Sequence, residues 1–213
     1  MKVFNPVYQQ KISDIYAEYK KTVSPLVAFL EANDAEFPIE ILNEIRAIFT
    51  HFSRIYDESV SDEEISSEIK KAEGHLNRAI LDCYKYNCVS LYDFYNQFRK
   101  EYKFADLSCI DNGDFLTHIT KNFAEAKERL LDAKISERKN KDKEDLYAEY
   151  EIAFALFLKN FNLINSKIGI IHRVSKKARW SRFWGNFWIL DFACVGSFGH
   201  FAFYKIKSIL IFI

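Results

Sequence analysis

The sequence predicts an all-α protein, a bundle of long coiled-coil-like helices followed by one C-terminal transmembrane helix. Apolar residues make up 49% of the 213 residues and recur at spacings of three, four and seven, as on one face of a helix. No proline follows Pro38, so little interrupts helices after that point. Residues 183–204 form an apolar stretch of the length that crosses a bilayer. We expect a bundle over 1–135, a charged segment over 136–145, a basic juxtamembrane helix packed on the bundle over 146–182, the membrane helix over 183–204 and a tail over 205–213.

Two helices are predicted before residue 60. The first begins at Asn5, an N-cap residue followed by proline, and continues to about Glu31. Pro25 should kink or restart it after Thr22, because proline lacks the N–H that the helix needs. The second helix follows Pro38. We expect its core face to carry Leu42, Ile45, Phe49, Phe52 and Tyr56.

The third predicted helix is unusually long. Ser61 and Glu64 form a capping-box pattern at its start, and nothing except Gly74 weakens it before Tyr102. At about 1.5 Å per residue this is a rod of roughly 60 Å. Its apolar stripe consists of Ile65, Ile69, Ala72, Leu76, Ala79, Ile80, Cys83, Phe94 and Phe98.

A turn at 111–114 leads to a fourth helix, and a second helical stripe follows the charged run 136–145. The first stripe consists of Ile119, Phe123, Ala126, Leu130 and Ala133, and the second of Tyr150, Phe154, Phe157, Phe161, Ile164, Ile168 and Ile171. The two stripes differ in phase by more than half a turn. Either the charged run closes a helical hairpin, or a solvated helix changes partner there; usual loop lengths favour the hairpin.

Charge divides the chain into two parts. Residues 1–151 hold 29 acidic and 21 basic residues, a net charge of −8, whereas residues 152–213 hold nine basic and one acidic residue, a net charge of +8. A nucleic-acid-binding protein would not carry so large an acidic segment, since it repels phosphate. Residues 1–30 lack the continuous apolar run of a signal peptide, so we expect the body in the cytoplasm.

Sequence patterns of reaction chemistry are missing from the chain. No Gly-rich phosphate loop, nucleophile elbow or zinc motif is present, so we expect a protein that is not an enzyme and uses no cofactor. Cys83, Cys88, Cys109 and Cys194 do not form a disulfide framework and are expected as reduced thiols. A metal site built from His75, Cys83, Cys88 or His118 is disfavoured, and His51 and His172 are expected to be isolated surface or interface residues.

One polar group on the third helix is a candidate site. His75, Arg78 and Asp82 lie on one side of the helix, with Glu68 one heptad before His75. One interpretation is a proton-sensitive or ligand-binding network in which Asp82 raises the pKa of His75. The other, which the spacing favours, is an interhelical salt bridge beside the core.

Residues 183–204 are predicted to span the membrane because their flanks are typical of a span. Basic and tryptophan side chains precede or begin the stretch and are expected at the lipid headgroups: Lys176, Lys177, Arg179, Trp180, Arg182, Trp184 and Trp188. Fewer basic residues follow it, which places the N-terminal side in the cytoplasm. The alternative is a buried helix or strand of a soluble bundle, because Asn186, Asp191 and His200 are costly in lipid. Aromatic residues all around the helix argue for lipid.

Polar and small residues within the stretch predict helix association. Asn186, Ala193, Ser197 and His200 form one strip, which Gly196 and Gly199 flank. Asp191 faces the other way and either lines a water-filled path, pairs with a partner's cation or is merely tolerated. The chain ends on the apolar run "SILIFI", which leaves a truncated reading frame or a partial second span open.

These features predict a membrane effector that forms homo-oligomers, binds anionic lipid headgroups and perturbs or permeabilises the cytoplasmic membrane. By analogy of architecture, helical proteins of this kind occur as toxins or antiviral defence effectors in bacteria. One alternative is a passive tether or scaffold whose acidic body binds a protein partner. Another is a soluble helical binding module. No nucleic acid is expected as a partner.

Overall fold

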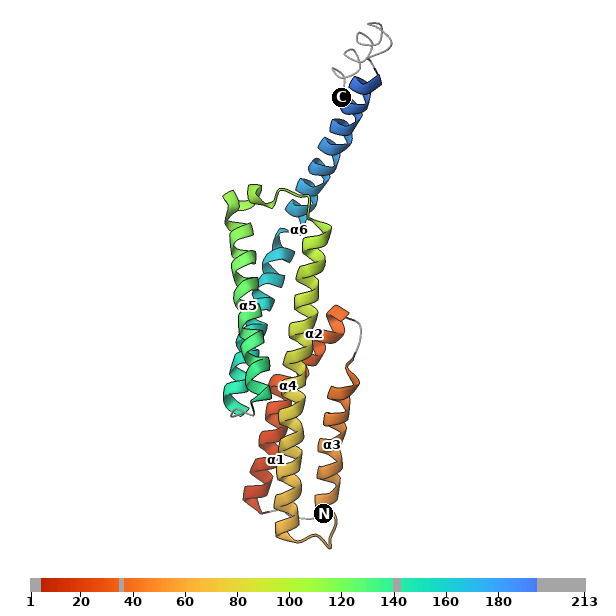
Figure 1. Cartoon of the computed structure of the whole chain (residues 1–213). Coiled ribbons are helices and arrows are strands. Elements are labelled where there is room, and N and C mark those ends of the chain that lie inside the picture. Colours follow the sequence, from red (N-terminus) through yellow and green to blue (C-terminus); the bar gives the residue numbers. More distant parts are fainter. Residues whose placement is uncertain (1–4, 35–36, 140–142, 195–213) are drawn as a thin grey trace.

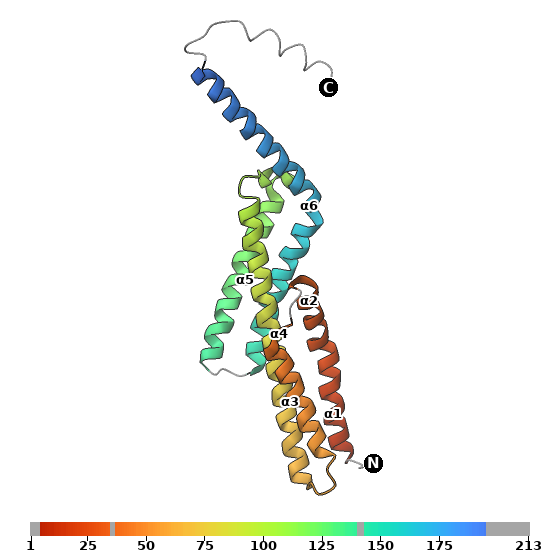
Figure 2. The same ribbon diagram turned by 90° about the vertical axis from the view of Figure 1, so that its right-hand side faces the viewer.

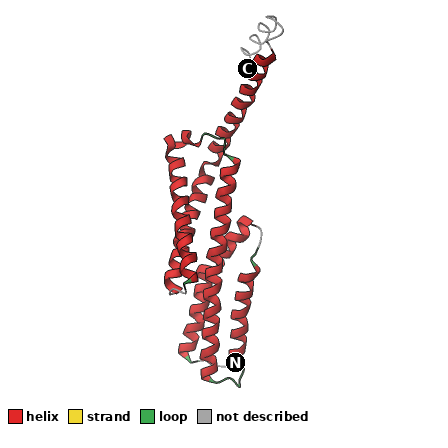
Figure 3. Ribbon diagram, viewed as in Figure 1, coloured by secondary structure: helices red, strands yellow, loops and turns green. Residues whose placement is uncertain are grey.

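The computed structural model describes residues 5–34, 37–139 and 143–194, and within the last helix it leaves out the side chains of 143–146, 179 and 181–194. All regular structure in these ranges is helical, which confirms the predicted all-α class (Figure 3). The elements are α1 (Pro6–Glu18), the π-helix η1 (Tyr19–Val23), α2 (Ser24–Asp34), α3 (Ile39–Ile55), α4 (Asp62–Glu101), the 3-10 helix η2 (Leu107–Gly113), α5 (Asp114–Arg138) and α6 (Lys143–Cys194).

Helix α4 is the common spine of the molecule. α1 and α3 pack along its N-terminal half, α2 packs beside its middle, where Asn87 and Ser90 contact α2, and α5 and α6 pack along its C-terminal half (Figures 1 and 2). With 40 residues at about 1.5 Å each, α4 is the rod that the sequence predicts. Its capping box is present, with the Ser61 hydroxyl accepting from the Glu64 N–H and Glu64 accepting from the Ser61 N–H.

The first helix begins and bends where the sequence predicts. The Asn5 side chain accepts a hydrogen bond from the Val7 N–H at 3.0 Å, and Pro6 occupies the first helical position. Near Pro25 the chain widens into the π-helix η1, where the Ser24 N–H donates to the Tyr19 carbonyl. Because Pro25 has no N–H to donate, this wider turn carries the chain into α2 without a break.

The core face of α3 differs from the predicted one. Of the residues predicted to be in the core, Phe52 is buried and Ile45 is half-buried, but Leu42, Phe49 and Tyr56 are 51%, 56% and 56% exposed. The other buried residues of α3 are Ile41, Ile48 and Ile55. The two stripes lie side by side on the helix, and both are apolar. Contact with α4 selects the isoleucine-rich stripe and leaves the other one on the surface.

The stripes of α5 and α6 pack as an antiparallel pair. Tyr150, Phe157, Ile164 and Ile171, one heptad apart, are buried in α6, and Ile119, Ala126, Leu130 and Ala133 are buried in α5. Since α5 ends at Arg138 and α6 begins at Lys143, the charged run lies at a hairpin, as the loop-length argument predicts. Rings of α2 and α6 join the two halves of the molecule, because Phe29 lies 6.0 Å from Phe154 and 5.8 Å from Phe161 between ring centroids.

Helix α6 continues past the end of the bundle. His172 still contacts Tyr102 near the end of α4, but the helical backbone extends to Cys194 and leaves the bundle obliquely (Figures 1 and 2). The basic, tryptophan-containing part of the chain is therefore presented away from the packed body.

Candidate functional site at the interface of α3 and α4

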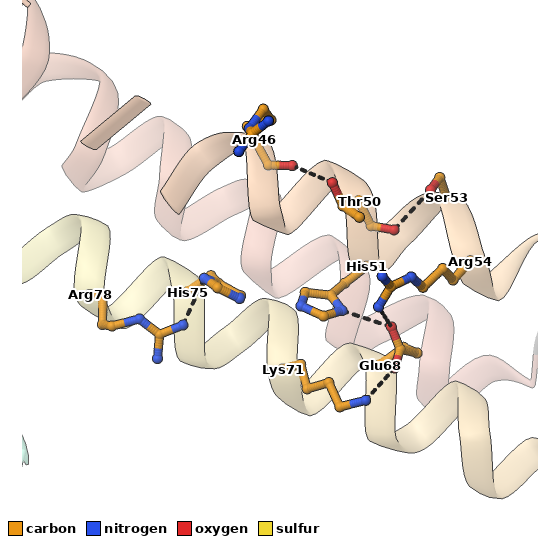
Figure 4. A network of polar contacts seen from close by, with 9 residues as sticks. All are labelled: Arg46, Thr50, His51, Ser53, Arg54, Glu68, Lys71, His75 and Arg78. Carbon is orange, nitrogen blue, oxygen red and sulfur yellow. Dashed lines mark hydrogen bonds and ion pairs between the residues drawn. The ribbon is translucent and has the colours of Figure 1, made fainter. Parts of the chain in front are cut away.

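The candidate site is a polar network between α3 and α4, and Glu68 of α4 is one of its two carboxylates. The Glu68 side chain is only 12% exposed, yet three cationic or hydrogen-bonding groups reach it (Figure 4). His51 Nδ1 lies 2.7 Å from Glu68 Oε2, Arg54 Nη1 lies 3.3 Å from the same oxygen, and Lys71 Nζ donates to the other oxygen. The hydrogen bond with His51, followed by that with Lys71, lowers the pKa of Glu68 from its ordinary value of 4.5 to about 2.

The second carboxylate, Glu44 of α3, is shared by His75 and Arg78 of α4. His75 Nδ1 lies 2.7 Å from Glu44 Oε2, and Arg78 Nε donates to that oxygen at 2.9 Å. Arg78 Nη2 also lies 2.7 Å from His75 Nδ1. A protonated Nδ1 donates to Glu44, and an unprotonated Nδ1 accepts from Arg78. His75 therefore keeps a hydrogen bond at Nδ1 in either protonation state.

The two carboxylate groups are joined by stacked imidazoles. The rings of His51 and His75 lie 5.0 Å apart at 28° (Figure 4). Glu44 and His51 are seven residues apart on α3, and Glu68 and His75 are seven apart on α4, so each pair shares a helix face. In an antiparallel pair of helices, one heptad forward on one helix opposes one heptad backward on the other. The sequence thus places His51 beside Glu68 and Glu44 beside His75.

The predicted network is correct in part. Glu68, His75 and Arg78 belong to it, but Lys71 of α4 and the partners from α3, which are Glu44, His51 and Arg54, were not predicted. The expectation that His51 is isolated is wrong. Asp82 is also not the partner of His75; it lies 3.7 Å from Lys85 Nζ, and burial raises the pKa of Asp82. The matching seven-residue spacing of Glu44/His51 and Glu68/His75 is the signal that could have identified the pairing.

The network is a set of hydrogen bonds and ion pairs between α3 and α4, and the described residues beside it indicate no metal or thiol chemistry. In the part of the chain that the structure describes, no three His, Cys, Asp or Glu side chains are arranged to hold a metal ion. Burial raises the pKa of both the Cys83 and the Cys88 thiols to about 12, which keeps them protonated and poor as ligands or nucleophiles. His172, also predicted to be isolated, has its ring within 3.4 Å of the Tyr102 hydroxyl.

The predicted membrane residues lie on or beyond the projecting end of α6. Lys176 and Lys177 are exposed there, and Trp180 is 66% exposed. Arg179, Arg182, Trp184, Asn186, Trp188, Asp191 and Ala193 belong to the α6 backbone, but their side chains lie outside the described part. Gly196, Ser197, Gly199 and His200 lie outside the described residues. Within the described residues, no helix has the length and apolar character required to cross a membrane.

Comparison of the chain with protein-family models, curated proteins and solved structures returns no match.

Proposed function

We propose that the protein is a membrane-anchored helical effector. The observation that carries this proposal is the course of α6, which packs on the bundle as far as Val174 and the buried Ser175 and then continues as one helix to Cys194. Arg173, Lys176 and Lys177 are exposed on this projecting part, followed by the exposed Trp180. Basic residues followed by tryptophan are typical of a helix entering a membrane interface. A rigid helix fixes the bundle close to the bilayer.

In this proposal the bundle stays in the cytoplasm and α6 enters the cytoplasmic membrane with the apolar residues 183–204. Association of several copies brings together the strips of Asn186, Ala193, Ser197 and His200, whose small and hydrogen-bonding side chains suit close helix contact. Water that follows these polar groups, and Asp191, into the assembly perturbs or permeabilises the membrane.

Fractionation of cells that produce the full chain tests the anchor, and a potential-sensitive dye tests the effect. We expect the protein to stay with the membrane in alkaline carbonate and the membrane potential to fall on expression. Asn186→Leu and His200→Leu together should restore the potential while the protein remains inserted, because they remove polar groups from the strip. An inserted protein that leaves both potential and growth unchanged would contradict the effector proposal.

A passive tether is the second candidate, and the surface of α3 favours it. Leu42, Phe49 and Tyr56 are seven residues apart and are each more than half exposed, so they form an apolar stripe along the outer side of α3. Apolar stripes of this spacing are a common contact surface for a partner helix. In that case α6 only locates the bundle at the membrane, and the α3 stripe holds a protein partner.

A further inference from the structure

If α6 enters the membrane, a second surface of the bundle also lies near the lipid. This surface, named here the α4–η2 corner, consists of the last turn of α4, the following loop and η2. It contains Arg99, Lys100, Lys103 and Phe104. Tyr102 in the same turn lies within 3.3 Å of the His172 ring of α6, so the corner stands where α6 leaves the bundle (Figure 1).

The distance along α6 brings the corner within reach of lipid headgroups. From His172 to Phe183, where the predicted span begins, there are eleven residues, or about 16 Å of helix. The headgroup layer takes up roughly 5–8 Å of this distance. An upright helix therefore leaves about 10 Å, which is close to one Debye length at physiological salt. A tilt of α6 in the bilayer shortens that distance, and long basic side chains cover much of the rest.

The basic groups of the corner are exposed and stay available for a ligand. Among the described residues, no carboxylate forms an ion pair with Arg99, Lys100 or Lys103, although all three are exposed. Nearby Asp106 is engaged, since its carboxylate accepts from the N–H and the hydroxyl of Ser108. The three cations, together with Arg173, Lys176 and Lys177 of the emerging helix, outnumber the three carboxylates of the corner. These are Glu101, Asp106 and Asp111, and Asp111 is already paired with Lys167.

A small cavity lies between these groups. Arg99, Lys103 and Ser108 line it, together with Tyr102, Leu116 and the carboxylate-bearing Asp106, and its volume is about 210 Å³. Sites for whole small molecules are usually larger, about 300–1,000 Å³, so this cavity suits a single phosphoryl group. Beside it Phe104 is 54% exposed, with Lys103 Nζ 4.5 Å from its ring centroid. An exposed aromatic ring next to basic residues is typical of a surface that contacts the membrane interface.

We infer that the α4–η2 corner docks on the anionic lipid surface, with a lipid phosphate held by Arg99 and Lys103 and with Phe104 at the headgroup level. The inference rests on the membrane anchoring proposed above, because that anchoring brings the corner to the bilayer, but the contact between the corner and lipid is a separate interaction. It gives the bundle a second attachment and fixes its orientation. Each basic side chain near an anionic surface strengthens binding about fivefold, so two of them shift the balance between docked and undocked bundle about 25-fold.

Exposed Cys109 in η2 supplies a probe of the corner in the full chain. We would label Cys109 with an environment-sensitive fluorophore in a Cys194→Ser background; Cys83 and Cys88 are buried, and their thiols stay protonated. The protein is reconstituted in vesicles of phosphatidylcholine alone or with about 30 mol% phosphatidylglycerol, which mimics an anionic leaflet. Acrylamide quenching then reports whether the label is shielded.

We expect the ratio of shielded to quenched label to rise at least about tenfold on the anionic vesicles and to fall again in about 0.5 M salt. Arg99→Glu with Lys103→Glu should abolish the rise. Lys11→Glu with Lys70→Glu makes the same change in charge at exposed positions near the other end of the bundle and should leave the rise intact. Circular dichroism and the thermal midpoint establish that both variants are folded.

The outcomes separate the docking from the anchoring. A carbonate-resistant protein whose label is quenched equally on both vesicles overturns the docking and leaves the anchoring standing. A protein that carbonate releases but whose label is shielded only on anionic vesicles supports the docking and contradicts the anchoring. Loss of shielding in both double variants alike shows general charge attraction and overturns docking through the α4–η2 corner. A protein that binds neither kind of vesicle also overturns the docking.

Discussion

Glu68 shows how one carboxylate can be held between two helices. It is nearly buried, and burial alone would favour its neutral form. The hydrogen bonds from His51 of α3, and from Lys71 of its own helix, outweigh this effect and hold its pKa at about 2. A group whose pKa is lower in the folded state stabilises that state above the unfolded pKa, and the stabilisation is lost as the pH falls to the folded pKa. For Glu68 this window runs from about 4.5 down to about 2.

We therefore predict that Glu68→Gln reduces the acid sensitivity of the protein. At pH 7 the variant should be less stable than wild type by about 2–3 kcal/mol, because the ionised hydrogen bonds are lost. As the pH falls from 5 toward 2 the two proteins should converge, and urea unfolding at several pH values measures this. Glu73→Gln, at an exposed position of the same helix, should retain the wild-type difference between pH 7 and pH 3. Parallel curves for wild type and Glu68→Gln would contradict the prediction.

Buried asparagines fix contacts between other helices. Asn160 of α6 is 2% exposed and donates to the Ile119 carbonyl of α5 at 2.7 Å, and Asn87 of α4 donates to the Leu26 carbonyl of α2 at 3.1 Å. The carbonyl oxygens of both side chains are buried without a hydrogen-bond partner among the described residues. Each asparagine thus joins two helices at some cost in desolvation.

We predict that Asn160→Ala destabilises the protein by about 1–2 kcal/mol, the usual range for losing a buried hydrogen bond and leaving a small cavity. Asn165→Ala, at an exposed position on the same helix, should change stability by less than about 0.5 kcal/mol. Chemical denaturation measures both. A more stable Asn160→Ala would mean that the unpartnered oxygen of Asn160 outweighs its hydrogen bond to α5.

At the scale of elements, most helix boundaries were predictable because their signals are local. Asn5-Pro6, the Ser61 capping box and the turn before Asp114 all lie where helices begin. The core face of α3 was not predictable, because two adjacent stripes are both apolar and only contact with α4 separates them. The polar network between α3 and α4 was predictable only in part, because half of it comes from another helix. Spacing on α4 reveals Glu68, His75 and Arg78, but their partners Glu44 and His51 are 17 to 34 residues away in sequence.

The cap of α4 allows a test at this scale. We predict that Ser61→Ala lowers the free energy of unfolding by about 1 kcal/mol, because it leaves the Glu64 N–H without its acceptor. Ser67→Ala, exposed in the second turn of the same helix, should be neutral or slightly stabilising, because alanine has the higher helix propensity. Equal effects of the two substitutions in denaturant titrations would show that the capping box adds nothing to α4.

At the scale of the whole molecule, the charge distribution and the projection of α6 both favour an orientation in which the C-terminal end of the chain faces an anionic surface. The first 151 residues carry a net charge of −8, and the remainder, which includes the projecting part of α6, carries +8. Near an anionic surface such a molecule orients with its basic end toward the lipid and its acidic body away from it. The apolar stripe of α3 lies on the half of the bundle far from the emerging helix (Figure 1). A partner can therefore reach α3 while α6 is in the membrane.

This arrangement separates the effector from the tether in one pair of variants. The first replaces residues 176–213 by an unrelated single-span anchor, and the second is Leu42→Glu with Phe49→Glu on the exposed stripe. An effector loses its action on growth and membrane potential with the first variant and keeps it with the second, because the predicted association strip lies in the exchanged segment. A tether shows the reverse, since two buried charges at a helix contact would expel the partner. We expect the effector result. Growth, dye fluorescence and membrane fractionation of both variants distinguish the effector from the tether. Activity that is retained with the foreign anchor would contradict our proposal.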